Sequence, residues 1–286
     1  MSRINDRFLN CVLYLYPSKD AAMQGGPQGG TGFLYGIPVN KEANRYHVIV
    51  VTCRHLLTMK EVYLRINSSD GEYKIFKTIS HDWTIDPTED LAICALDLDE
   101  TLRIGYVRQF HDTVTKDSHA GMDIGPGDDV FIIGKFSKHS GLQQNTPVVR
   151  FGNLAMMPFE PIYNESIGLE TYCYLVDLRI QEGFSGSPVF VQYQFRFSKG
   201  KGNMLASGPW SGEHLLGISW GGFTTRESIN YENSASLPGY GVRIHDGMAC
   251  VIPVERIDSL VTKYLEGRGI RIGEDGKPKF GLSSSV

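Results

Sequence analysis

The sequence lacks any long apolar segment. No apolar run approaches the roughly 20 residues that a membrane-spanning helix needs. The amino-terminal stretch MSRINDRFLNCVLYLYP mixes charged residues into a short hydrophobic run, and it lacks the n-region, h-region and small-residue cleavage site of a secretory signal. We therefore expect no membrane partner and a cytoplasmic location.

An excess of positive charge is also missing. The chain has 28 Lys and Arg against 32 Asp and Glu, which gives a net charge of −4. This balance provides no basic field that would attract phosphates, so we expect no nucleic-acid partner.

Disulfide and metal-binding patterns are absent as well. The cysteines form an odd set without CxxC spacing, which argues against a disulfide framework and a zinc knuckle. They are Cys11, Cys53, Cys94, Cys173 and Cys250. We expect buried free thiols in a reducing cytoplasm. The histidines include no HExxH pair, so the sequence predicts no metal site.

Short β-rich runs dominate what is present, and they fall into two sets. The first set covers 11–16, 30–37, 46–51, 61–66, 72–79 and 91–97, and the second covers 130–136, 148–157, 172–180, 187–195, 214–222 and 247–253. Strands at this spacing without alternating helices predict an all-β protein of antiparallel barrels or sandwiches. The Gly-rich loop 121–129 separates the sets, so we expect domains at 1–122 and 123–268.

One segment has a convincing helical period. After Pro253 the apolar residues share one stripe, and Gly267 is placed to end the helix. The stripe consists of Val254, Ile257, Val261, Tyr264 and Leu265. We expect a C-terminal helix packed on the second domain, followed by a loose tail at 269–286. The polar stretches 195–213 and 224–239 are either substrate-gating loops or solvated hairpin connections.

The segment QEGFSGSPVF (181–190) places Ser185 in a glycine-walled turn before an apolar strand. A serine hydroxyl becomes nucleophilic only when an imidazole takes its proton, and a carboxylate best fixes the tautomer of that imidazole. His55 follows one β-rich run, and Asp90 precedes another. The alternative is that these are ordinary turn residues.

Six ordered segments resemble those of trypsin-like serine proteases. TCRHL (52–56), EDLAI (89–93) and GFSGSPV (183–189) are similar to TAAHC, NDIAL and GDSGGPV. GTGF (30–33) and GISWGG (217–222) resemble the family's GSGF and VSWG, and GMACVIP (247–253) resembles the closing segment of Deg-type bacterial members. The resemblance spans about residue 8 to 265. A GxSG match alone is weak, but six in order are a strong signal.

The resemblance implies two six-stranded antiparallel β-barrels with the active site between them. His55 would be the general base and acid, Asp90 its orienting carboxylate and Ser185 the nucleophile. The N–H groups of Gly183 and Ser185 would form the oxyanion hole, with glycine at 183 allowing the bend. Ser219 would hydrogen-bond Asp90, and 219–221 would pair with the substrate as an added strand. The implied activity is that of a bacterial-type serine endopeptidase without a metal or organic cofactor.

The sequence departs from the family pattern at several positions. Phe184 replaces the aspartate that precedes the serine in trypsin, and no IVGG-like segment exists, so activation by proteolytic trimming is not expected. Cys53, next to the base, is either a redox control or a buried inert thiol, and the inert reading is favoured.

Specificity follows from the resemblance only by position. The base of the S1 pocket would be near Arg179, and its walls near Ile180, Gly221 and Ala249. If the Arg179 side chain points away from the pocket, the pocket is apolar, and we favour this arrangement. If it points into the pocket, its guanidinium would pair with an acidic substrate residue. Trp220 would wall the substrate cleft, although an aromatic residue on a strand is often core.

Two classes of function remain open at this stage. The first is a peptidase that acts on protein or peptide substrates, with control either by a regulatory protein partner or by a resting, misformed oxyanion loop. The second is a catalytically silent relative that binds an extended peptide as a scaffold. The complete set of His55, Asp90 and Ser185 favours the enzyme.

Overall fold

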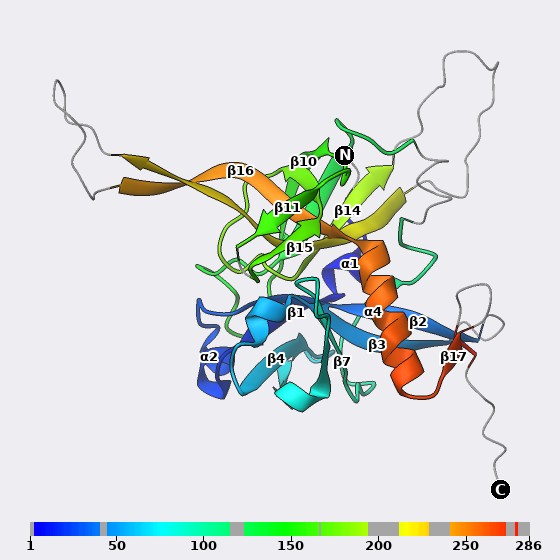
Figure 1. The fold of residues 1–286 in the computed structure, drawn as a ribbon. Coiled ribbons are helices and arrows are strands. Elements are labelled where there is room, and N and C mark those ends of the chain that lie inside the picture. The colour runs from blue at the N-terminus through cyan, green and yellow to red at the C-terminus, as the bar shows by residue number, and fades with distance from the viewer. Residues whose placement is uncertain are drawn as a thin grey trace, which may run out of the picture.

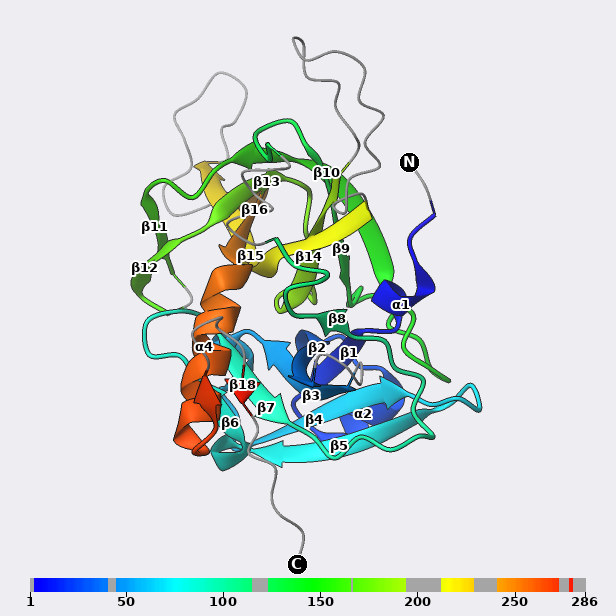
Figure 2. The same ribbon diagram turned by 90° about the vertical axis from the view of Figure 1, so that its right-hand side faces the viewer.

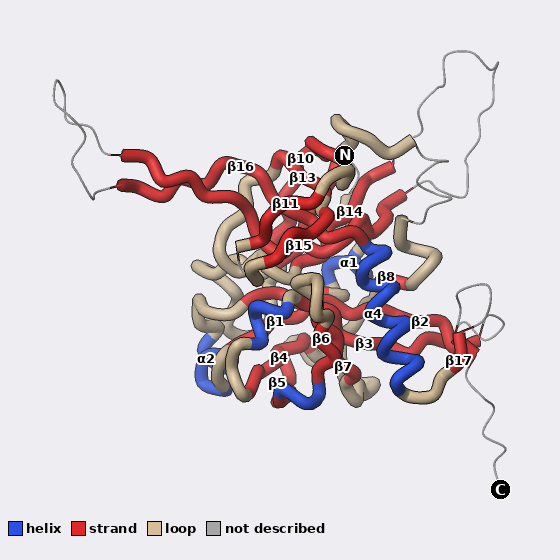
Figure 3. Tube along the Cα trace, viewed as in Figure 1, coloured by secondary structure: helices blue, strands red, loops and turns tan. Residues whose placement is uncertain are grey.

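The structure is a computed structural model of the 286-residue chain. It describes residues 3–40, 45–114, 123–165, 167–193, 212–228, 241–272 and 278–279. Strands dominate it, as Figure 3 shows, and most of them belong to an N-terminal sheet and a C-terminal barrel that lie one above the other (Figure 1). The predicted all-β class is confirmed.

The N-terminal sheet has eight strands in the order β5-β4-β1-β2-β3-β7-β6, with β8 paired in parallel to β2. The strands are β1 (Val12–Tyr16), β2 (Gly30–Asn40), β3 (Arg45–Thr52), β4 (Glu61–Asn67), β5 (Tyr73–Ile79), β6 (Trp83–Ile85), β7 (Ala92–Ala95) and β8 (Val107–Arg108). The first of the two expected barrels is thus an eight-stranded sheet that does not close within the described residues. A 3-10 turn, η2 (Ser80–Asp82), joins β5 to β6, and these two edge strands do not pair within the described residues.

The C-terminal strands form the expected six-stranded barrel, closed in the order β10-β13-β16-β15-β14-β9. Its strands are β9 (Asp129–Gly134), β10 (Val148–Met156), β13 (Tyr174–Asp177), β14 (Ser187–Tyr193), β15 (Gly212–Ser228) and β16 (Gly241–Pro253). The run expected at 172–180 supplies β13, and only its first residue, Tyr172, belongs to a separate hairpin of β11 (Pro161–Asn164) and β12 (Leu169–Tyr172) that the sequence did not predict.

The predicted C-terminal helix is α4 (Val254–Gly267), and every member of its apolar stripe is buried. The helix continues through Gly267, and Gly269 follows it with a positive φ of 75°. The amides of Gly269 and Ile270 close the end by donating to Glu266 and Leu265. Beyond it, β17 (Arg271–Ile272) pairs with β18 (Pro278–Lys279), so part of the expected loose tail forms a short ladder.

One hydrophobic core cluster spans both sheets, and a second lies within the N-terminal sheet. Phe8, in the short helix α1 (Asp6–Leu9), packs on Phe190 of the barrel with ring centroids 4.6 Å apart. A second short helix, α2 (Lys19–Gln24), covers β1 and β4. Helix α4 runs beside both sheets (Figure 2), where Asp258 accepts hydrogen bonds from Tyr35 and Gln109 of the N-terminal part. No helix within the described ranges is long and apolar enough to cross a membrane.

Strands β15 and β16 continue beyond the barrel as an arm (Figure 1). Their pairing runs from Thr224 opposite His245 to Ser228 opposite Gly241. The stretch expected as a loop at 224–239 therefore begins as a strand, and 229–240 lies outside the described residues. Of the other stretch, 195–211 also lies outside them, and 212–213 begins β15.

Candidate active site

His55 and Asp90 come together because β3 and β7 are neighbours. Thr52 at the end of β3 pairs with Ala92 at the start of β7. The 3-10 turn η1 (Arg54–Leu57) begins just after β3, and Asp90 precedes β7. The two side chains therefore lie at the same end of adjacent antiparallel strands.

The Asp90 carboxylate uses both oxygens on His55. Oδ2 lies 2.6 Å from the imidazole Nδ1, and Oδ1 accepts from the His55 amide at 2.9 Å. The Asp90 side chain is fully buried, whereas that of His55 is 22% exposed. A buried carboxylate in this position holds the proton on Nδ1, which leaves Nε2 as the acceptor.

The turn that carries Ser185 requires glycine at two positions. Gly183 has φ 99°, and a Cβ there would lie 2.6 Å from the Lys135 carbonyl oxygen. Gly186 has φ 84°, and its Cβ would lie 1.9 Å from the Thr31 carbonyl oxygen. Within the described part of the chain, the amides of Gly183 and Ser185 donate to no acceptor. Both N–H groups therefore lack an acceptor in the described structure.

The Ser185 hydroxyl donates to the Trp220 carbonyl oxygen at 3.2 Å. Among the described contacts, it makes no hydrogen bond to His55. The segments are nevertheless adjacent, because Gly30 lies against both Leu56, the neighbour of His55, and the Ser185 carbonyl. The structure brings His55 and Asp90 into contact and leaves Ser185 close by, with its hydroxyl turned to β15.

Ser219 does not take the two roles expected from sequence. Its hydroxyl is buried and has no hydrogen-bond partner in the described structure, and the Asp90 carboxylate instead contacts the amide and the Nδ1 atom of His55. Its backbone pairs with Ser187 on one side and Val251 on the other. A strand has two edges, so none remains for a substrate at Ser219. The unpaired edge of β15 begins at Trp220.

The residues expected around an S1 pocket lie in different surroundings. Arg179 is exposed, and its carbonyl accepts from Arg150. Ile180 and Ala249 are buried around Gly222, where a Cβ would lie 3.0 Å from the Ile180 Cδ1 atom and where β16 places Ala249 opposite.

Trp220 and Gly221 follow Ser219 on β15. The Trp220 indole is 5% exposed and belongs to the core, so only its carbonyl faces Ser185. Gly221, also expected to bind substrate, pairs with Cys250.

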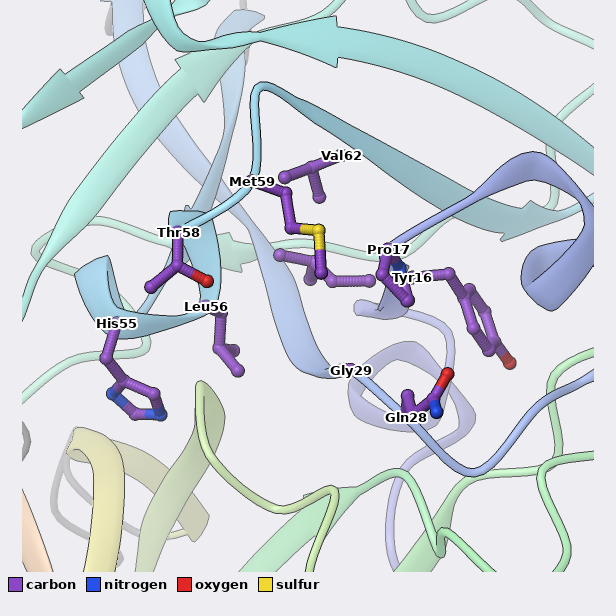
Figure 4. A pocket seen from close by; sticks show the side chains of 10 residues that line it. Tyr16, Pro17, Gln28, Gly29, His55, Leu56, Thr58, Met59 and Val62 are labelled. Carbon is purple, nitrogen blue, oxygen red and sulfur yellow. The ribbon is translucent and has the colours of Figure 1, made fainter.

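A pocket of about 380 Å³ lies beside His55 (Figure 4). Apolar side chains contribute most of its lining, among them Leu56, Met59 and Val62, while Gln28 adds a polar group. Sequence reasoning missed this pocket, because its lining comes from three separate segments that no local pattern links.

Cys53 lies next to the His55–Asp90 pair with its thiol fully buried. Burial, and then the Asp90 charge, raises the pKa of its thiol well above the usual range. The thiol donates to the Ser219 carbonyl at 3.4 Å. All five cysteines are unpaired and buried, as expected.

Cys53, His55 and Asp90 are also the one group of three potential metal ligands in the described chain. Their contacts do not fit an ion. The Nδ1 and Oδ2 atoms touch each other directly, and the thiol is held protonated.

Lys135 is a buried cation close to the Ser185 turn that sequence reasoning did not single out. Its ammonium donates to the Gln28 carbonyl at 2.5 Å and lies 4.1 Å from the Tyr16 ring centre. Burial, helped by the Arg65 charge, lowers the pKa of this ammonium to about 7. A lysine at the end of the apolar run VFIIGKF was the available signal.

No protein-family model matches the chain, and no curated protein matches it in sequence. Among solved structures, it is similar to the Rv3671c protease in its inactive form, with 14% identity and a TM-score of 0.45 over 90% of each chain. It is also similar to a serine-to-alanine mutant of Rv3671c from M. tuberculosis H37Rv, in the inactive form. That match has 13% identity and a TM-score of 0.45, and covers 90% of this chain and 89% of the other.

Proposed function

We propose that the protein is a serine endopeptidase in which Ser185, His55 and Asp90 form the catalytic triad. The observation that carries the proposal is the 2.6 Å contact between the fully buried Asp90 carboxylate and Nδ1 of His55. Close to this pair lies the Ser185 turn, in which the amides of Gly183 and Ser185 have no acceptor within the described structure. A carboxylate, an imidazole and a hydroxyl in this order are the groups that acyl transfer requires.

In the proposed reaction, the Ser185 hydroxyl first rotates from the Trp220 carbonyl toward Nε2 of His55. Nε2 accepts the hydroxyl proton as Oγ bonds to the substrate carbonyl carbon, and the carbonyl electron pair moves to oxygen. The amides of Gly183 and Ser185 bind that oxyanion. His55 then gives its proton to the leaving amine, and the resulting acyl-enzyme is hydrolysed by water with His55 again as the base.

The surroundings of the triad support an extended peptide substrate with apolar side chains. The pocket beside His55 is lined mostly by aliphatic groups, and Arg179 points its side chain to solvent. The β15 edge from Trp220 onward can hydrogen-bond a peptide backbone. The free thiols are compatible with a bacterial-type cytoplasmic enzyme, and a regulatory protein partner remains part of this proposal.

One observation favours a second candidate, a silent member that binds peptides as a scaffold. The Ser185 hydroxyl is bonded to the Trp220 carbonyl instead of His55. If this arrangement persisted with substrate bound, the hydroxyl would keep its proton and no acyl-enzyme would form.

A fluorophosphonate probe separates the two candidates. We expect the wild-type protein to form one adduct, located on Ser185 by peptide mass spectrometry, and Ser185→Ala to form none. Ser187→Ala removes a buried hydroxyl two residues away and is expected to retain the adduct. A folded wild-type protein that stays unlabelled and cleaves no peptide in a library would favour the scaffold.

A further inference from the structure

Thr31, in the N-terminal sheet, reaches across to the Ser185 turn of the barrel. It is fully buried near the start of β2. Its hydroxyl lies 2.6 Å from the Gly183 carbonyl oxygen, and its amide donates to the Ser185 carbonyl at 2.9 Å. One residue therefore holds the two carbonyls on either side of the peptide that carries the Ser185 N–H.

The direction of the Thr31 hydroxyl proton follows from its other contact. The Lys135 amide, which can only donate, gives a hydrogen bond to the Thr31 oxygen at 2.9 Å. The Thr31 proton is thus free to point to Gly183. The Thr52 hydroxyl donates to the Thr31 carbonyl at 2.8 Å, which fixes the backbone from the opposite side.

The turn needs such support because of its own conformation. Gly183 has φ 99°, and glycine can adopt other backbone conformations more easily than any other residue. The amides of Gly183 and Ser185 make no hydrogen bond within the described structure, so they contribute nothing to holding the turn. The contacts to Thr31, the Gly186 amide bonded to Ser219, and the buried Phe184 ring fix it instead.

We infer that Thr31 is a positioning residue that holds the oxyanion-binding turn in its working geometry from the neighbouring sheet. The inference rests on the proposed function, since it assigns the turn to oxyanion binding. Thr31 contacts neither the substrate nor the reacting atoms, and its hydroxyl acts through the Gly183 carbonyl.

Three variants test the inference. Thr31→Val keeps the shape and loses the hydroxyl, while Thr31→Ser keeps the hydroxyl. Thr78→Val is the matched control, because the buried Thr78 hydroxyl also donates to a carbonyl, of Val62, and accepts an N–H, from Trp83. It lies in β5 and, in the described structure, contacts none of His55, Asp90 and the Ser185 turn.

The readouts are peptide hydrolysis and hydrogen exchange of the 182–187 segment followed by mass spectrometry. Loss of one oxyanion donor typically lowers kcat by about 10²–10³, and we expect a loosened turn to cost about tenfold or more in kcat with little change in KM. Thr31→Val should also exchange the amides of Gly186 and Ser187 faster. Thr31→Ser should restore both readouts, and Thr78→Val should change neither.

The outcomes separate this inference from the proposed function. If Thr31→Val exchanges faster but the wild-type protein hydrolyses no peptide, the positioning role of Thr31 is supported and the peptidase is rejected. If the wild-type enzyme is active and Thr31→Val keeps both the wild-type kcat and the wild-type exchange rates, the positioning role of Thr31 is overturned. Equal losses in Thr31→Val and Thr78→Val would also overturn it, because they would reflect general destabilisation.

Discussion

At the scale of single residues, two cations are buried together without an ion pair. Lys135 and Arg65 are both fully buried, and within the described chain neither contacts a carboxylate. Neutral oxygens satisfy them instead: the Lys135 ammonium donates to the carbonyls of Pro27 and Gln28. The Arg65 guanidinium donates to the carbonyls of Ala22 and Gly141 and to the side-chain oxygen of Asn145. These bonds tie the segment before β2 to the barrel that carries Ser185.

This burial predicts a pH dependence of stability. The pKa of the Lys135 ammonium falls from 10.5 to about 7 on folding. Between these two pKa values the lysine is protonated in the unfolded chain and neutral in the folded protein. The free energy of unfolding should therefore rise with pH across this window, and this gain in stability should be lost as the pH falls to about 7. The contribution is at most about 1.4 kcal/mol per pH unit.

Urea unfolding of Lys135→Met between pH 7 and 10 measures this slope. The variant should lack the rise that the wild type shows, while Lys138→Met, which alters an exposed lysine three residues away, should keep it. Parallel pH profiles for the wild type and Lys135→Met would contradict the assignment.

The residues that sequence motifs predicted differ physically from those they missed. His55, Asp90 and Ser185 stand in short contiguous motifs, so their types and order can be compared directly. Thr31 and Lys135 depend on contacts between distant segments, which a single sequence does not record. The expected Ser219–Asp90 bond, which the described structure lacks, could not be judged from sequence either, because it depends on where the Ser219 hydroxyl lies relative to the carboxylate in the folded chain.

At the scale of elements, α4 fastens the two sheets together. The Asp258 carboxylate accepts from the Tyr35 hydroxyl at 2.7 Å and from the Gln109 amide at 2.8 Å. Burial raises the pKa of Asp258 to about 6. Lys263 adds an ion pair to Asp86 at 3.1 Å. The helix was predictable because its period is local, whereas its partners in the other sheet were not.

Removal of one of these bonds should weaken the whole fold. Tyr35→Phe leaves the buried Asp258 with one donor, and we expect it to lower the free energy of unfolding by about 1–3 kcal/mol at pH 8. Tyr264→Phe, in α4 itself, removes a hydroxyl that has no hydrogen-bond partner in the described structure and should be nearly neutral. Urea unfolding compares the two, and equal effects would contradict the anchoring role.

At the scale of the whole molecule, the proposed site depends on both sheets. The N-terminal sheet supplies His55, Asp90 and Thr31, and the barrel supplies Ser185 and Gly183. The sequence predicted the barrel's six strands, because their runs are long and apolar. It did not predict that the first sheet stays open or that β15 and β16 extend as an arm, because strand closure and pairing length depend on distant partners.

The central claim is that the Ser185 hydroxyl can leave the Trp220 carbonyl and act with His55 and the oxyanion turn. A crystal structure with a peptide boronate tests it most directly. We predict a boron bond to Ser185 Oγ, with one boronate oxygen within hydrogen-bond distance of the Gly183 and Ser185 amides and another facing Nε2 of His55. A well-ordered Ser185 still bonded to Trp220, with the boronate absent or bound elsewhere at saturating concentration, would contradict the account.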